Sequence, residues 1–221
     1  MKVGTDSIML GSWVQTNNAQ FILDIGTGSG LLGIMLAQKS QDTCLIHGID
    51  IDGVAISQAK DNAKNCPWSK RLTFHNTSLQ QFPVGTGYDL IVCNPPYFPV
   101  NLSANKTNLV KSRANARQTI ELDHPTLLKG VTKHLTSNGL FCCVLPEHVA
   151  KIFTMHAESV GLYCTRELQV QPKHRTNVTR LLLEFGCIKK SKISEKLSIH
   201  NHLGNYSEEY ITLCKNYYLN F

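Results

Sequence analysis

The sequence predicts an α/β fold in which a mostly parallel sheet carries helices on both faces. Three observations predict it: short apolar runs alternate with segments of helical periodicity, a glycine-rich turn follows the first of these runs, and the second run ends in an acid. This alternation is typical of doubly wound sheets, whose ligands bind beyond the carboxyl ends of the strands. We therefore expect the functional side chains at the strand ends.

The length and composition favour one well-cored, soluble domain. The chain has 221 residues, of which 42% are hydrophobic and 17% are charged, and its net charge is +6. A positive excess favours a polyanionic partner. The eight cysteines form no CxxC pair and several lie in apolar runs, so we expect reduced core thiols and a cytoplasmic protein. No apolar run approaches the length of a membrane span.

Residues 1–20 contain the first predicted helix. Apolar residues at helical spacing follow Thr5 and Asp6, either of which can serve as the N-cap. A hydroxyl and a carboxylate at a helix start can also face a ligand, although capping alone explains both residues.

A strand over residues 21–25 leads into the glycine-rich turn and a helix. The turn holds Gly26, Gly28 and Gly30, and Asp24 precedes it. Glycine allows a close backbone approach to a ligand, and the carboxylate can accept from a ligand's ammonium or amide. A dinucleotide fingerprint would place its third glycine one residue later, where this chain has Leu31. The spacing therefore disfavours a nicotinamide oxidoreductase.

The second predicted strand, residues 44–50, ends in Asp50, at the position where doubly wound domains hold ribose hydroxyls. Asp52 competes for that role, although it is better placed as the N-cap of a helix over residues 54–64. Both acids can also be solvated strand-end groups. A third strand over residues 72–76 is followed by Thr77-Ser78-Leu79, where such domains contact adenine.

The fourth strand, residues 88–93, is followed by Asn94-Pro95-Pro96-Tyr97. Two prolines lack N–H groups, so the ladder stops and the chain is stiffened. The result is a rigid turn with outward carbonyls, an amide before it and an aromatic ring after it. Such a turn suits a planar amine such as the N6 group of adenine, whereas the alternative is an ordinary strand-ending turn.

The next segment, residues 98–117, is polar and contains four basic residues: Lys106, Lys111, Arg113 and Arg117. A long connection of this kind is either a solvated loop or a functional one, here placed to meet a phosphate backbone. We expect a helix over residues 119–135 ended by Asn138-Gly139, a strand over 140–145 and a helix over 147–160.

Two further strands, residues 162–170 and 179–185, are joined by a basic turn that contains Lys173 and Arg175. These residues are either a charged edge or an RNA contact. We assign residues 1–187 to the main domain and 188–221 to a basic linker with a docked terminal helix. His200, His202 and Cys214 match no common zinc spacing, so we expect no metal.

Together, several stretches resemble a known family. They are KVGTD at 2–6, LDIGTGSGLLG at 23–33, NPPYF at 94–98, the basic segment 113–117 and YSEEYITL at 206–213. They are similar to the NPPY-type class I methyltransferases that use S-adenosyl-L-methionine (AdoMet), and most of all to the bacterial family that methylates N6 of adenine 37 in tRNA(Val). The resemblance covers nearly the whole chain.

This resemblance implies a Rossmann-like, seven-stranded sheet with an antiparallel last strand, AdoMet as cofactor and a tRNA anticodon stem-loop as partner. It also implies a monomer that uses neither metal nor membrane. The implied catalytic residues are Asn94, Pro95, Pro96 and Tyr97. The implied AdoMet-binding residues are Thr5, Asp6, Asp24, Gly26, Gly28, Gly30, Asp50, Ile51, Ser78, Leu79 and Asn94. The implied RNA-binding residues are Lys106, Lys111, Arg113, Arg117, Lys173 and Arg175.

The sequence departs from this family at two points. Ser78 stands where many AdoMet enzymes carry an acid that accepts from the adenine amine. Members of the family usually have an aromatic, basic segment before KVGTD, whereas this chain begins at Met1. The alternatives are a methyltransferase for another RNA or DNA adenine, one for a protein glutamine, whose amide suits the same acceptors, and a non-catalytic RNA-binding module.

Overall fold

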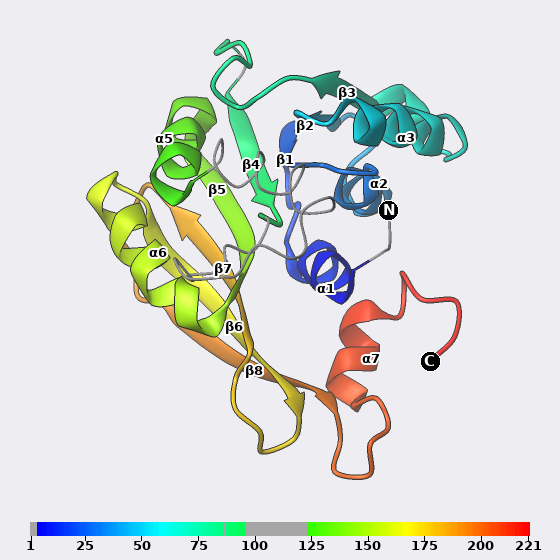
Figure 1. Ribbon diagram of the computed structural model, residues 1–221, viewed down its shortest axis with the longest axis vertical. Coiled ribbons are helices and arrows are strands. Elements are labelled where there is room, and N and C mark those ends of the chain that lie inside the picture. The colour runs from blue at the N-terminus through cyan, green and yellow to red at the C-terminus, as the bar shows by residue number, and fades with distance from the viewer. Residues whose placement is uncertain (1–3, 86, 96–122) are drawn as a thin grey trace, which may run out of the picture.

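The structure is a computed structural model that describes residues 4–85, 87–95 and 123–221 (Figure 1). Its helices are α1 (Thr5–Trp13), α2 (Leu31–Lys39), α3 (Gly53–Lys64), a 3-10 turn (Ser69–Arg71), α5 (His124–His134), α6 (Glu147–Ser159) and α7 (Glu208–Cys214). Its strands are β1 (Phe21–Ile25), β2 (Leu45–Asp50), β3 (Leu72–Asn76), β4 (Tyr88–Cys93), β5 (Leu135–Pro146), β6 (Tyr163–Lys173), β7 (Arg180–Gly186) and β8 (Ile193–His200).

The described strands form one sheet in the order β3-β2-β1-β4-β5-β7-β6-β8. The first five in this order pair in parallel, and β7 runs antiparallel to both β5 and β6. The order reverses direction at β1, between β2 and β4. This is the point at which ligands bind in open α/β sheets, beyond the carboxyl ends of the strands.

Helices cover both faces of the sheet, as predicted (Figure 1). Successive residues of a strand point to opposite faces, so Ile22 of β1 packs in the core beneath α1, α2, α3 and α7. Its neighbour Leu23 packs in the second core, beneath α5 and α6. The α/β class predicted from the sequence is therefore confirmed.

The sheet contains one strand more than predicted. Residues 193–200, which we assigned to a linker, form β8 and pair in parallel with β6. Glu167 of β6 accepts hydrogen bonds from Lys192 at 2.7 Å and from Ser194 at 2.9 Å, which ties the start of β8 to the sheet. The antiparallel strand is β7, so it is not the last strand of the chain.

One predicted helix cap and one predicted strand start are wrong. The N-cap of α1 is Gly4 in an extended conformation, and neither Thr5 nor Asp6 caps the helix. The helix predicted over 119–135 ends at His134, within one residue of the predicted end. The strand predicted from residue 140 instead begins at Leu135 and runs through the Asn138-Gly139 pair that we took as the stop signal of the helix. A Cβ at Gly139 would lie 2.8 Å from the carbonyl oxygen of Tyr88, so this glycine permits close contact with β4.

The eight cysteines are free thiols, and five of them are buried. Burial raises the pKa of the buried thiols Cys93, Cys142 and Cys143, which keeps them protonated at neutral pH. Among the described residues, no helix is both long and apolar enough to cross a bilayer.

Candidate active site

The glycine-rich turn lies between the carboxyl end of β1 and the start of α2. Gly26, Gly28 and Gly30 have φ values of +69°, +55° and +82°, a left-handed region that disfavours other residues. The N–H of Gly26 donates to the carbonyl of Ile49 at 2.9 Å, which fixes the turn to β2. A Cβ on Gly26 would meet no atom within 4 Å, so the turn has open space beside it.

Asp24 of β1 is fully buried beneath this turn. Its Oδ2 accepts from the Thr27 hydroxyl at 2.6 Å and from the Gly33 N–H at 3.2 Å. Desolvation outweighs these bonds and raises the pKa of Asp24 to about 7. Its Oδ1 is buried and has no hydrogen-bond partner among the described residues. A buried acceptor without a donor fits a ligand's ammonium group.

Asp50 joins the end of β2 to the glycine turn. Its Oδ2 accepts from the Gly28 N–H at 2.9 Å, and its Oδ1 accepts from the Asp52 N–H at 3.0 Å. These two bonds orient the carboxylate at the edge of the glycine turn, and carboxylate oxygens are acceptors for hydroxyl donors. Asp52 caps α3 by accepting from Val54 at 2.9 Å, as predicted.

Asn94 leaves the sheet next to the glycine turn. Cys93 of β4 lies opposite Ile25 of β1 in the parallel register, so the residues that follow them, Asn94 and Gly26, emerge side by side. The Asn94 Nδ2 donates to the Ser7 Oγ of α1 at 2.8 Å. This bond fixes the plane of the carboxamide, and therefore also the direction of its Oδ1 acceptor.

The first turn of α1 lies next to Asn94, which bonds to Ser7. Asp6 forms an ion pair with Arg180, at the start of β7, with 3.1 Å between Oδ2 and Nε. Thr5 is exposed. The predicted AdoMet-binding residues Thr5 and Asp6 thus lie on the same helix as Ser7, the partner of Asn94. Sequence reasoning missed Ser7, because its role depends on a residue 87 positions away.

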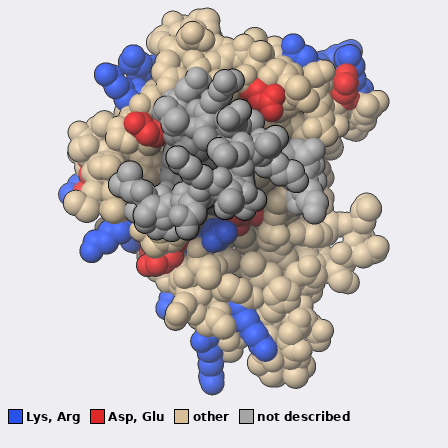
Figure 2. Space-filling model, in the orientation of Figure 1, with Lys and Arg blue, Asp and Glu red and all other residues tan. Residues whose placement is uncertain are grey.

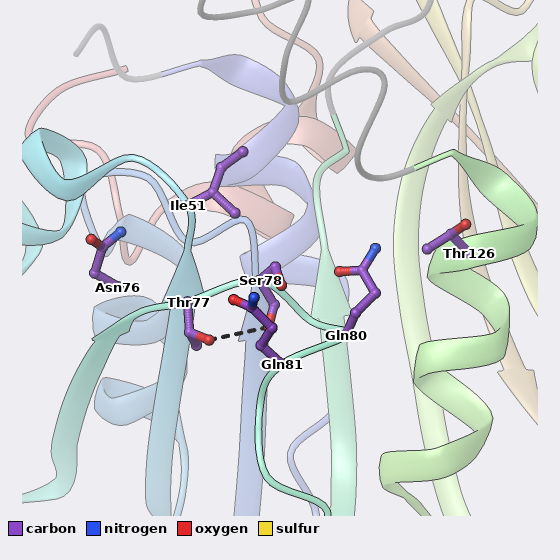
Figure 3. A pocket seen from close by; sticks show the side chains of 7 residues that line it. All are labelled: Ile51, Asn76, Thr77, Ser78, Gln80, Gln81 and Thr126. Atoms are coloured by element: carbon purple, nitrogen blue, oxygen red, sulfur yellow. Dashed lines mark hydrogen bonds between the residues drawn. The ribbon is translucent and has the colours of Figure 1, made fainter.

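A cavity of about 640 Å³ opens beyond the ends of β2 and β3 (Figure 3). Its lining is mostly polar and consists of Ile51, Asn76, Thr77, Ser78, Gln80, Gln81 and Thr126. Ile51 and Ser78 were predicted to bind the cofactor. Sequence reasoning missed the glutamines, although they directly follow the predicted segment, and it had no signal for Thr126 on α5.

Leu79 faces the core beneath this cavity and is 4% exposed. Its side chain lies against α5 at Gly130, where an added Cβ would come within 2.3 Å of the Leu79 Cδ2. Gly130 therefore allows the segment that lines the cavity to pack directly on α5.

The remaining predicted residues lie elsewhere. Lys173 ends β6, and Arg175 occupies the following turn with a φ of +63°; both are exposed. Six predicted residues lie outside the described part of the chain: Pro96, Tyr97, Lys106, Lys111, Arg113 and Arg117. Pro95 is described and buried.

The fold agrees with comparisons to solved structures. A predicted O-methyltransferase from Agrobacterium tumefaciens superimposes with a TM-score of 0.71 at 13% identity, covering 96% of each chain. A putative RNA methyltransferase from Pyrococcus horikoshii gives a TM-score of 0.58 at 13% identity, covering 84% of this chain and 81% of its own. These likenesses show the fold.

Sequence comparison shows the family. Curated relatives named tRNA1(Val) (adenine(37)-N6)-methyltransferase include one from Pseudoalteromonas atlantica, 44% identical over all of this chain and 93% of its own length. Another, from Salmonella typhi, is 38% identical over 99% of this chain and 89% of its own. A family model described as methyltransferase small domain matches residues 2–161. The chain therefore belongs to the methyltransferase small domain family.

Proposed function

We propose that this protein transfers a methyl group from AdoMet to N6 of adenine 37 in tRNA1(Val). The observation that carries the proposal is the placement of Asn94 beside Gly26, where β4 and β1 end in register. This brings an acceptor for an aromatic amine next to a turn built for close ligand approach. The full-length similarity to relatives with that name supports the choice of substrate.

The residues at the strand ends fit AdoMet. Asp24 Oδ1 is a buried acceptor suited to the ammonium of the methionine moiety. Asp50 is oriented by two backbone N–H groups and would accept from ribose hydroxyls. Ile51 and Ser78 line the cavity beside it, which suits the adenine ring. When bound here, AdoMet supplies an electrophilic methyl group.

The acceptors on this chain address the weak nucleophilicity of the target amine. Its nitrogen lone pair is delocalised into the adenine ring. The Asn94 Oδ1 and the Pro95 carbonyl would accept the two N6 hydrogens and draw the nitrogen toward tetrahedral geometry. Because the Ser7 hydroxyl already holds the carboxamide, these dipoles need little reorganisation as positive charge develops. The proton can leave after the transfer, so no general base is required before attack.

The RNA would approach from the carboxyl edge of the sheet. Lys and Arg side chains project at the end of the molecule where the β6–β7 turn lies (Figures 1 and 2). Lys173 and Arg175 belong to this turn, and β6 ends at the same edge as β4. Phosphate contacts position a nucleic acid without reading its sequence, so these residues suit the backbone of the anticodon stem.

We place this activity in the cytoplasm and assign it to a monomer.

The test is methyl transfer to defined substrates. Labelled AdoMet is incubated with unmodified tRNA1(Val), with the same transcript carrying guanine at position 37, and with release factors. We expect N6-methyladenosine, identified by nucleoside mass spectrometry, in the first reaction alone. Label in the release factors would instead favour a glutamine methyltransferase. Binding of tRNA without any transfer would indicate a non-catalytic module and overturn the proposal.

Gly130→Ala tests how the cavity is held open. The new methyl group would clash with Leu79, and overpacking of this kind typically costs about 1–3 kcal/mol. We expect a lower Tm and weaker binding of S-adenosyl-L-homocysteine by calorimetry, because the cavity-lining segment must shift. Gly186→Ala is the matched control, since its Cβ would meet only ordinary contacts, the nearest at 3.5 Å. Wild-type affinity in Gly130→Ala would show that Leu79 does not position this segment.

A further inference from the structure

The cavity beyond β3 has a hydroxyl where an acid would be expected. Ser78 lies at the start of the segment that lines it. Its side chain is shorter than the acid that the family resemblance leads one to expect at this position. A bound adenine presents an exocyclic amine that donates hydrogen bonds. The Ser78 hydroxyl can accept one of them, but a neutral acceptor is weaker than a carboxylate, so a second acceptor from the cavity lining would strengthen recognition of the amine.

Gln81 lies one turn beyond Ser78. The N–H groups of Gln81 and Phe82 donate to the Ser78 carbonyl at 3.2 and 3.0 Å, so residues 78–82 form a single helical turn. Leu79 and Phe82 are buried on its inner side, which leaves Gln80 and Gln81 facing outward. In Figure 3 the end of the Gln81 side chain lies beside Ser78, whereas Gln80 is directed toward Thr126 of α5.

We propose that the Gln81 carboxamide recognises the adenine of AdoMet and takes the place of the acid that Ser78 does not provide. This inference rests on the proposed function, because it assigns the specificity of the same cofactor site. The carboxamide Oε1 would accept from the adenine N6 group while Nε2 donates to an adjacent ring nitrogen. A glutamine carboxamide matches the alternating donor and acceptor atoms of adenine in this way.

The packing beneath the turn supports this role. Leu79 lies against α5 at Gly130 and Phe82 is 9% exposed, so two buried anchors fix the turn that carries Gln81. Gln81 itself is exposed, so its carboxamide can meet a ligand without leaving a core contact. A rigid backbone with a free side-chain end is the arrangement that a binding site requires.

Gln81 can also have a purely structural role, which the experiment must distinguish from recognition of adenine. Serine followed three residues later by glutamine is a capping box, in which the glutamine accepts from the serine N–H. A capping role would affect the stability of the turn and binding of every ligand equally. Recognition of the amine would affect only ligands that carry it.

The experiment is a thermodynamic cycle that compares binding free energies when Gln81 is replaced by alanine, when the amine is removed from the ligand, and when both changes are made. Calorimetry compares S-adenosyl-L-homocysteine with its analogue in which hydrogen replaces the 6-amino group. We expect the wild type to favour the amino form by about tenfold, as one well-made hydrogen bond allows. We expect Gln81→Ala to lose this preference to within about twofold, and Gln80→Ala, the matched control, to keep it.

Two further variants test the replacement directly. Gln81→Glu retains an acceptor and should keep the preference, and Ser78→Asp combined with Gln81→Ala should restore it. An equal preference for the amine in wild type and Gln81→Ala, or no preference in the wild type, would overturn the inference while leaving the proposed function intact. Failure of the wild type to bind S-adenosyl-L-homocysteine at all would instead overturn the proposed function.

Discussion

Replacing Asn94 with alanine should lower the rate of methyl transfer by about 100- to 1,000-fold, the usual effect of removing one preorganised polar group from a reacting centre. Affinity for S-adenosyl-L-homocysteine should change by less than about threefold, well under 1 kcal/mol. The difference is expected because, in the proposed mechanism, the carboxamide oxygen acts where charge develops on the target nitrogen, whereas the residues proposed to hold the cofactor lie mainly at the ends of β1 and β2. Single-turnover kinetics and calorimetry on the same preparations measure the two quantities.

Two substitutions of similar size separate the acceptor from the bulk of the side chain. Asn94→Asp keeps acceptor oxygens and should retain more activity than Asn94→Leu, which has none. Ser7→Ala removes the hydroxyl that receives the Asn94 Nδ2 at 2.8 Å, so it should slow transfer by a smaller factor, about tenfold. If Asn94→Leu transfers methyl groups at the wild-type rate with unchanged Tm, the acceptor role is wrong.

The sequence was sufficient to predict the strands at the centre of the sheet. The observed β4, Tyr88–Cys93, matches the predicted residues because the run is buried except at Asp89 and two prolines follow it. Strand β8 was missed because it pairs with the sheet along one side and is largely exposed over its first four residues. Edge strands of this kind carry charged residues and show little apolar alternation, so local pattern does not reveal them.

Strand β5 shows why boundaries were harder to predict than elements. Asn-Gly is a common stop signal after a helix, so we began the following strand only at residue 140, whereas β5 begins at Leu135. In the structure, Gly139 instead permits the approach of β5 to the Tyr88 carbonyl of β4. A glycine required by a contact with a distant strand cannot be distinguished locally from one that ends a helix.

In the candidate site, too, features set by local sequence were predicted and those set by distant contacts were not. The sequence predicted that Asp24, Asp50 and Asn94 would gather, because the carboxyl ends of parallel strands share one edge. It did not predict the contact of Ser7 with Asn94 or that of Gly130 with Leu79. Each of these partners is far away along the chain, so only the packed structure reveals the pairs.

Replacing Asp24 with asparagine should weaken binding of S-adenosyl-L-homocysteine by about 10- to 100-fold, because a hydrogen bond to a charged group is worth about 1.5–3 kcal/mol. The substitution preserves shape, and the asparagine oxygen can still accept from Thr27 and Gly33. What is lost is the negative charge that would face the ligand ammonium. S-adenosyl-L-homocysteine has no methyl group to transfer, so its affinity reports the binding role of Asp24 directly.

The same variant should stabilise the protein without ligand at alkaline pH. Burial raises the pKa of Asp24 from 3.8 to about 7, so the folded state favours the protonated form. Its contribution to stability is fully present below pH 3.8 and is lost as the pH rises to about 7. Between pH 5 and pH 8 this loss is on the order of 2–3 kcal/mol in the wild type, at 1.36 kcal/mol per pH unit. Asparagine does not ionise, so the Asp24→Asn variant should not show this loss of stability.

Denaturant unfolding at pH 5 and pH 8 tests the sign. The difference in unfolding free energy between Asp24→Asn and wild type should increase with pH. Burial also lowers the pKa values of the partly buried His47 and the buried His134, but the effects of these histidines cancel in the difference because both proteins contain them. Ligand affinity in the wild type should rise with pH up to about 7 and then level, since a cationic ligand must displace the Asp24 proton below that pH. A wild type whose affinity is independent of pH, or a variant whose relative stability falls as pH rises, would show that Asp24 is not the buried, titrating partner of the ammonium.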